Sequence, residues 1–169
     1  MKKIYFAGKF NKCKQEKTLE KMLKNDYRSK LLKDAKLLTY YQPDLIVNEK
    51  FIYAGPFYCE QASNGDYTST DCNVVLDAEY NFIKNSDIFV VVLGENFSPG
   101  TIVELGWAIQ QNKQIIILYK EEPSAYNIKS EYWFAIADAV KRSKNLTIQK
   151  YQTEDEIVSL INNTFEKEF

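Results

Sequence analysis

Asp87-Ile88-Phe89-Val90-Val91-Val92-Leu93 (DIFVVVL) is a nearly continuous run of β-branched and other large apolar residues. A strand with one face in water alternates apolar with polar residues, so an unbroken run is typical of a parallel strand that helices cover on both faces. Lys113–Tyr119 (KQIIILY) has the same character. A helix from about Pro99 to about Gln111 fits between the two runs, because proline suits a first helical turn. Strand, helix and strand in this order predict a parallel crossover.

Strand and helix patterns alternate through the rest of the chain as well. Ile4–Gly8 reads as a short strand, residues 14–38 as a helix, and residues 50–58 as a strand that ends at Gly55-Pro56. A helix opens near Asp71, and a helix, a strand and a last helix follow KQIIILY. The helix after Asp71 is expected to bury an apolar stripe made of Val74, Val75, Ala78, Phe82 and Ile83. The pattern predicts one α/β domain over residues 1–169, a doubly wound parallel sheet of about five strands with helices on both faces.

Composition excludes several classes of protein. The chain has 169 residues, 45% apolar and 27% charged, and no apolar run approaches the roughly 18 residues of a membrane span. Its formal charge of −1 gives no electrostatic preference for nucleic acid or for a membrane surface, so a small-molecule substrate is expected. The amino-terminal apolar run is too short for a secretory leader, and we therefore expect a cytoplasmic protein.

The residue types also limit the chemistry. The chain has no histidine, and its 3 cysteines lack CxxC spacing, so neither a metal site nor a disulfide framework is expected. Acid-base chemistry must then fall to carboxylates, tyrosine, lysine or water. Neither GxGxxG nor GxxxxGK[ST] occurs, and no nucleotide cofactor is expected.

Three segments follow predicted strands and should meet at one edge of the sheet: 8–10, 55–58 and 94–104. Ligands of doubly wound sheets bind at the carboxyl ends of the strands. We therefore expect Gly8, Phe10 and Phe57 to contact a substrate. Gly100 opens a helix whose backbone N–H groups can hold a carboxylate or a phosphate.

Glu104 lies in the first or second turn of that helix and has two interpretations. A surface glutamate there is favoured by the helix dipole, by roughly 0.3–1 kcal/mol. The residues on both sides of Glu104 are apolar, however, and the helix follows the most buried strand. The alternative is therefore a carboxylate that points into a partly dry cleft and acts as a nucleophile.

The segments KKIYFAG, GPF, IKNSD and GTIVELGWA, in this order and spacing, resemble the nucleoside 2-deoxyribosyltransferases, and the similarity spans nearly the whole chain. The resemblance implies a flavodoxin-like fold and exchange of the base on a 2'-deoxyribonucleoside through a covalent deoxyribosyl-glutamate intermediate. Related branches of this family hydrolyse nucleoside 5'-monophosphates at the same bond.

The resemblance assigns roles to individual positions. Glu104 matches the family nucleophile, and Tyr5 matches the tyrosine that holds its carboxylate. Phe10 matches an aromatic residue of the base and sugar pocket, although a packed core aromatic is an equal alternative. Glu79 stands where most members have a base-contacting aspartate, and Asp77 is the nearest substitute. Either of these two acids could protonate the departing base, and either could instead be solvated helix surface.

Two further positions concern substrate and assembly. The transferases usually carry an aspartate six residues before the nucleophile, whereas this chain has Ser98, which resembles the nucleotide-hydrolysing branch. That branch's glycine- and arginine-bearing loop is replaced here by GKFNKCK. Asn127 resembles an asparagine that one subunit lends to its neighbour, which implies a homodimer or higher homo-oligomer, although a turn asparagine is an equal alternative.

The resemblance thus implies transfer of deoxyribose between nucleobases through Glu104. Hydrolysis of a nucleoside 5'-monophosphate is the alternative reaction. A catalytically silent domain that binds nucleosides or nucleotides is a third possibility, because a fold does not entail an activity.

Overall fold

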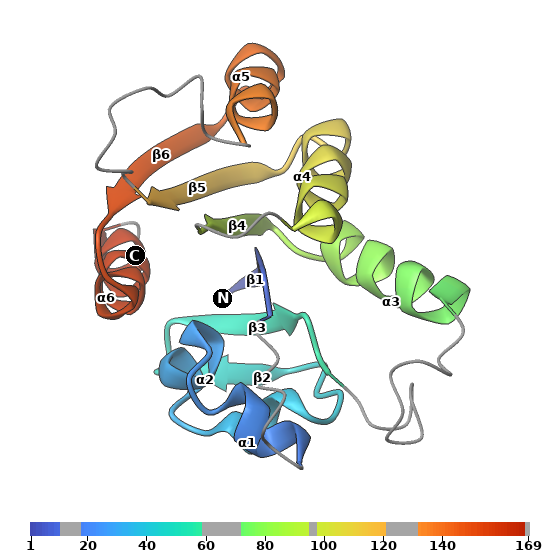
Figure 1. The fold of residues 1–169 in the computed structure, drawn as a ribbon, viewed down its shortest axis with the longest axis vertical. Helices are drawn as coiled ribbons and strands as arrows, with labels where there is room; N and C mark the ends of the chain where they lie inside the picture. Colours follow the sequence, from blue (N-terminus) through green and yellow to red (C-terminus); the bar gives the residue numbers. More distant parts are fainter. Residues whose placement is uncertain (11–17, 59–71, 95–97, 121–131, 168–169) are drawn as a thin grey trace.

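The computed structural model describes residues 1–10, 18–58, 72–94, 98–120 and 132–167. They form a six-stranded sheet in the order β2-β3-β1-β4-β5-β6 (Figure 1). The strands are β1 (Lys2–Gly8), β2 (Leu45–Val47), β3 (Phe51–Gly55), β4 (Ile88–Leu93), β5 (Gln114–Lys120) and β6 (Leu146–Tyr151). Neighbouring strands are parallel, except that β2 runs antiparallel to β3 at one edge. Without β2, the parallel strands have the flavodoxin-like order 2-1-3-4-5, so the predicted doubly wound sheet is confirmed.

β4 is the central strand that DIFVVVL predicts. All 6 of its residues are buried, and it lies between β1 and β5. Strand order reverses between β1 and β4, and in folds of this kind the crevice for a ligand opens at the carboxyl ends of those two strands.

Helices cover both faces of the sheet (Figure 1). On one face, α1 (Leu19–Leu23), α2 (Tyr27–Leu32) and α6 (Glu154–Lys167) share a core with Ile4 and Phe6 of β1. On the other face, α3 (Cys72–Lys84), α4 (Pro99–Gln110) and α5 (Trp133–Arg142) share a core with Tyr5 and Ala7. Because successive side chains of a strand point to opposite faces, Tyr5 lies on the side of α3 and α4.

The helix predicted over residues 14–38 is wrong as a single element. Its described part forms α1, α2 and a short 3-10 helix, η1 (Ala35–Leu38). The side chains of Asp26 and Asp34 each accept a backbone N–H bond from the residue two positions later, which is how such residues begin a new helix. Lys33, at φ 62°, ends α2 in the left-handed conformation.

The apolar stripe predicted for α3 is only partly buried. Ile83 is fully buried, but Val74 and Val75 are 56% and 39% exposed, so their placement in the core was wrong. Figure 1 shows why: the amino-terminal half of α3 extends outward past the sheet, and only the carboxyl-terminal half packs against it.

Within the described residues, no helix combines the length and the apolar character needed to cross a membrane. The same residues contain no group of three or more cysteine, aspartate or glutamate side chains placed to hold a metal ion.

Candidate active site

The hydroxyl of Tyr5 joins two carboxyl groups from different helices. Tyr5 Oη donates to Glu104 Oε1 of α4 at 2.7 Å and is also hydrogen-bonded to the carboxyl of Glu79 on α3. The Tyr5 ring is fully buried and stacks on Phe89 of β4, with 5.7 Å between ring centroids. Three residues far apart in the sequence thus meet beside the two strands where the strand order reverses.

Gly55, at the end of β3, leaves the space that the Tyr5 ring fills. A Cβ at position 55 would lie 3.1 Å from Tyr5 Cε2 and 3.2 Å from Phe82 Cδ2, closer than ordinary packing allows. Gly55 also has φ +138°, a backbone conformation that side chains rarely adopt. Gly55, the glycine of the GPF segment, therefore leaves room for the Tyr5 ring, which any larger residue at this position would displace.

Burial sets the protonation of the two carboxyl groups. Burial raises the pKa of Glu79 to about 8, helped by the nearby Glu104 charge and opposed by the Tyr5 hydrogen bond and the Arg28 charge. Burial likewise raises the pKa of Glu104 to about 7, again opposed by Tyr5 and Arg28. Burial and both carboxylates raise the pKa of Tyr5 well above its usual value, so Tyr5 stays a phenol.

The Tyr5 hydroxyl has a single hydrogen and can donate to only one of the two carboxyl groups, so the other carboxyl group must itself be protonated to bond to Tyr5. If Tyr5 donates to Glu104, its bond with Glu79 needs a hydrogen from the Glu79 carboxyl. The order of the two pKa values agrees, since Glu104 loses its proton first. Between the two pKa values, from about pH 7 to about pH 8, the cluster therefore holds a neutral acid, a phenol and a carboxylate in a row.

The other predicted acid, Asp77, is exposed on α3. Of the two candidates, only Glu79 contacts Tyr5. Of the two acids, Glu79 is thus the one that the fold brings to Glu104.

The aromatic residues that the sequence placed at this edge have different surroundings. Phe10 is half-buried, and its ring lies 4.9 Å from that of Tyr58, centroid to centroid. Phe57 is only 7% exposed, and its ring packs against the buried Tyr53, the half-buried Phe82 and the exposed Tyr41. Phe10 and Tyr58 present a partly open aromatic surface, whereas Phe57 belongs to the core beneath it.

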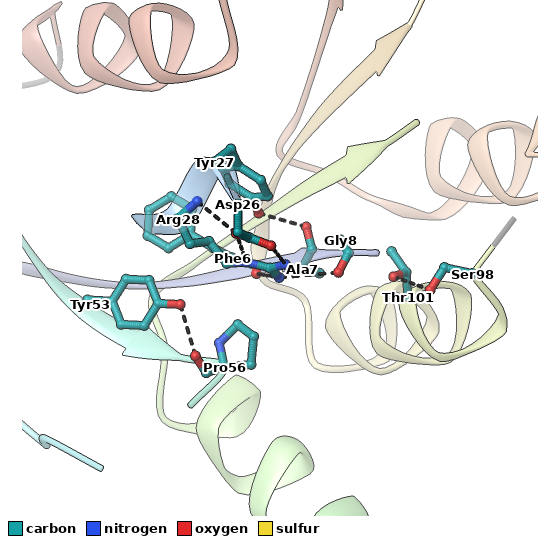
Figure 2. Close-up of polar contacts among 10 residues, drawn as sticks. All are labelled: Phe6, Ala7, Gly8, Asp26, Tyr27, Arg28, Tyr53, Pro56, Ser98 and Thr101. Carbon is teal, nitrogen blue, oxygen red and sulfur yellow. Dashed lines mark hydrogen bonds and ion pairs between the residues drawn. The ribbon is translucent and has the colours of Figure 1, made fainter. Parts of the chain in front are cut away.

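The amino-terminal end of α4 holds the next predicted positions. Ser98 is the N-cap residue of α4, and its hydroxyl accepts a bond of 2.9 Å from Thr101 Oγ1 rather than capping the backbone (Figure 2). Gly100 is exposed, with nothing within 4 Å of the position of a Cβ. Asn127 lies outside the described residues.

A cavity of about 240 Å³ opens at the same edge of the sheet, on the side of α2 and α6. Its walls include Lys9, Tyr27, Gly94, Lys120 and Tyr151. Gly8 is not one of its lining residues, and a Cβ there would lie 3.4 Å from the Tyr27 ring.

The fold has a known relative. No protein-family model and no curated protein matches the chain. A solved structure, the CMP N-glycosidase BcmB from Clostridium botulinum, matches with a TM-score of 0.54 over 96% of this chain and 99% of that one, at 20% identity. The two chains share a fold. The α/β Rossmann-like architecture expected from the sequence is confirmed by this match and by the sheet itself.

Sequence reasoning missed Arg28, which is fully buried behind β1. Its guanidinium forms an ion pair with Asp26 and also donates to the carbonyls of Phe6 and Gly8 (Figure 2). In the sequence, Asp26 and Arg28 look like ordinary charges of a solvated helix. The only local sign was an arginine two residues after a potential N-cap aspartate, a spacing that also occurs on exposed helices.

Proposed function

We propose that this protein cleaves the N-glycosidic bond of a nucleoside or nucleotide, with Glu104 as the nucleophile and Glu79 as the general acid. The observation that carries the proposal is the Tyr5 hydroxyl, bonded to a carboxylate and to a second carboxyl group of higher pKa. The fold shared with a CMP N-glycosidase supports this bond as the target.

The spacing of the two acids favours a covalent route. Two carboxyl oxygens bonded to one hydroxyl lie no farther apart than two hydrogen bonds, about 5.5 Å. Retaining glycosidases keep their carboxyl groups at about this separation, whereas inverting enzymes need more room for a water molecule. A nucleophilic Glu104 fits the shorter separation.

The proposed reaction has two steps. In the first, Glu104 attacks C1' on the face opposite the base, the C1'–N bond breaks with its electron pair going to the base, and Glu79 supplies a proton to that base. In the second, an acceptor attacks C1', the bond to Glu104 breaks, and Glu79 takes the proton of the acceptor. Tyr5 holds the Glu104 carboxylate throughout.

The resemblance to the deoxyribosyltransferases favours a second nucleobase as the acceptor and a 2'-deoxyribonucleoside as the substrate. Ser98 favours a second candidate, hydrolysis of a nucleoside 5'-monophosphate. A neutral hydroxyl at a helix N-terminus can donate to a phosphate, whereas an aspartate there would repel one. BcmB, by its name, acts on CMP.

We also propose that the protein forms at least a homodimer. Several apolar side chains on the helices of the Tyr5 face are exposed, among them Trp133 at 47% and Phe134 at 70%. Val74 and Leu76 of α3, the helix that carries Glu79, are exposed as well. A second subunit would bury such side chains, as expected if the segment around Asn127 completes a neighbouring pocket.

The test is to incubate the protein with deoxynucleosides, ribonucleosides and their 5'-monophosphates, with and without an acceptor base, and to separate the products by chromatography. A new nucleoside that forms only with the acceptor supports transfer, and free base with sugar phosphate supports hydrolysis. Mass spectrometry of the quenched protein should show a sugar adduct on the peptide that contains Glu104. Tight binding without any product would instead indicate a silent binding domain.

A further inference from the structure

Side chains of α2 bind all three carbonyl groups at the end of β1. Arg28 Nη1 donates to the carbonyls of Phe6 and Gly8 at 3.2 Å each, and the Tyr27 hydroxyl donates to that of Ala7 at 3.0 Å (Figure 2). β1 also carries Tyr5. Side chains of α2, on the opposite face of the sheet from the two acids, therefore hold the carboxyl end of β1 in place. β1 in turn positions the Tyr5 hydroxyl between Glu79 and Glu104.

The guanidinium is itself held on every side. Arg28 Nε and Nη2 donate to the two carboxylate oxygens of Asp26 at 2.7 and 2.6 Å. Its planar group lies 4.9 Å from the ring centre of Tyr27 and 5.3 Å from that of Tyr58. The side chains of Arg28 and Asp26 are 0% and 6% exposed. A charge fixed in this way cannot turn toward water.

Binding two carbonyl groups with a buried guanidinium carries a large desolvation free energy. Taking an ion pair out of water commonly costs as much as the pair returns, and neutral side chains can bind carbonyl groups without that penalty. Hydrogen bonding to the β1 carbonyls therefore does not by itself explain why this side chain is positively charged. The charge does act on the site, since Arg28 opposes the burial that raises the pKa of both Glu79 and Glu104.

We propose that Arg28 is a positioning residue for the acid pair: its bonds to β1 hold Tyr5 between Glu79 and Glu104, and its fixed positive charge favours the ionised form of Glu104. The role rests on the reaction proposed above.

The groups facing the two acids are few in the described part of the chain. Tyr5 of β1 lies between them, and Arg28 of α2 acts on both. Tyr27 and Tyr58 carry no charge near neutral pH, because burial raises the pKa of each far above 7. Among the described residues, Arg28 is thus the cation that acts on both acids.

The main variant is the pair Arg28→Met with Asp26→Asn, which removes the cation without leaving a buried aspartate unpaired. Arg28→Lys keeps the charge and loses the planar fork. Lys30→Met is the matched control on the same helix, because the ion pairs of Lys30, with Asp155 at 2.9 Å and with Glu154 at 4.0 Å, are exposed. Circular dichroism checks that each variant is folded.

Two readouts separate a charge effect from a purely structural one. The first is the pH profile of kcat/KM. The second is the titration of glutamate side-chain carboxyl carbons by NMR in 13C-labelled protein, assigned with Glu79→Gln and Glu104→Gln. The NMR titration needs no turnover, so it tests Arg28 even if the proposed reaction is wrong.

Loss of a nearby positive charge raises the pKa of a carboxyl group. We expect the double variant to move the acid limb of the profile and the Glu104 titration upward, because Arg28 and not Asp26 shifts the pKa of Glu104. The shift should be at most about one pH unit, which is up to a tenfold loss of kcat/KM below the limb. Arg28→Lys should leave the acid limb of the kcat/KM profile near its wild-type pH and lower the plateau value of kcat/KM. Lys30→Met should change neither the pH of the limb nor the plateau. A folded double variant with a reduced plateau but unmoved titrations would overturn the proposal, as would an equal shift in Lys30→Met. If the double variant does not fold, a shifted limb in Arg28→Lys, which retains the charge, would overturn it as well.

Discussion

Glu104→Gln should abolish turnover and stabilise the fold at the same time. The amide keeps the shape of the side chain and can still accept the bond that Tyr5 donates at 2.7 Å. It cannot form the covalent intermediate. We expect kcat/KM to fall by at least about 10⁴-fold, which corresponds to about 5.4 kcal/mol of transition-state stabilisation.

The gain in stability follows from the raised pKa. Glu104 titrates at about 4.5 when exposed and at about 7 in the folded protein, because burial disfavours its charged form. At 1.36 kcal/mol for each pH unit, ionised Glu104 costs the folded state about 3 kcal/mol above pH 7. Burial of the replacement amide offsets part of this gain, so we expect a net stabilisation of about 1–3 kcal/mol.

The sign of the effect depends on pH. Below about pH 4.5, Glu104 is protonated in both the folded and the unfolded states, and the variant has no advantage of this origin. The advantage should develop as the pH rises from about 4.5 to about 7 and then stay constant. Urea unfolding or melting temperatures at pH 5 and pH 8 measure it, and about 2–9 °C is expected at pH 8. A variant that is less stable than wild type at pH 8, or that retains turnover, would refute the reasoning.

The remaining predictions concern the neighbours of Glu104. Tyr5→Phe keeps the buried ring but loses both hydrogen bonds, so kcat should fall by about 10–100-fold with little change in KM; an unchanged kcat would contradict the role of the hydroxyl. Glu79→Gln should lower kcat/KM by about 10²–10⁴-fold, while its matched control Asp77→Asn, exposed on the same helix, should leave it unchanged; equal losses would exclude Glu79 as the specific acid. Ser98→Asp should reduce kcat/KM for a 5'-monophosphate by about tenfold more than for the nucleoside if phosphate binds there, as competition kinetics would show. Phe134→Lys should lower the molar mass measured by light scattering toward that of one chain, and a wild type that is fully active as a monomer would contradict the assembly proposal.

The sheet could be predicted because its signals are local. Each residue of β4 is apolar, and a strand covered on both faces buries all of them while the sheet pairs its backbone polar groups. The short strand β2 has a weak signal in the sequence, because it is only 3 residues long and Pro43 stands just before it. The breaks at Asp26 and Asp34 were missed because leucines at helical spacing continue across them, and side-chain capping decides the boundary there.

The sequence indicates Glu104 as a site residue, but it does not indicate the buried ion pair of Arg28 and Asp26. Glu104 stands out because apolar residues surround a carboxylate next to a buried strand. Arg28 carries no such mark, since apart from Asp26 its hydrogen-bond partners are carbonyls of β1, a strand distant in the sequence. A buried ion pair depends on tertiary packing, and helical spacing alone predicts these two charges to be exposed.

Helix geometry by itself distinguishes Asp77 from Glu79. Residues two positions apart on a helix point in nearly opposite directions, so only one of the two acids can face the sheet. Ile83 is the buried end of the predicted stripe, and Glu79 lies four residues before it, on the same face. Asp77 lies six residues before Ile83 and points elsewhere. The longer side chain of glutamate then spans the gap from the half-buried flank of α3 to the Tyr5 hydroxyl, where an aspartate would fall one methylene short. If the contact with Tyr5 is what positions Glu79 as the acid, Glu79→Asp should lower kcat/KM although it keeps a carboxyl group, and a kcat/KM equal to that of wild type would contradict this.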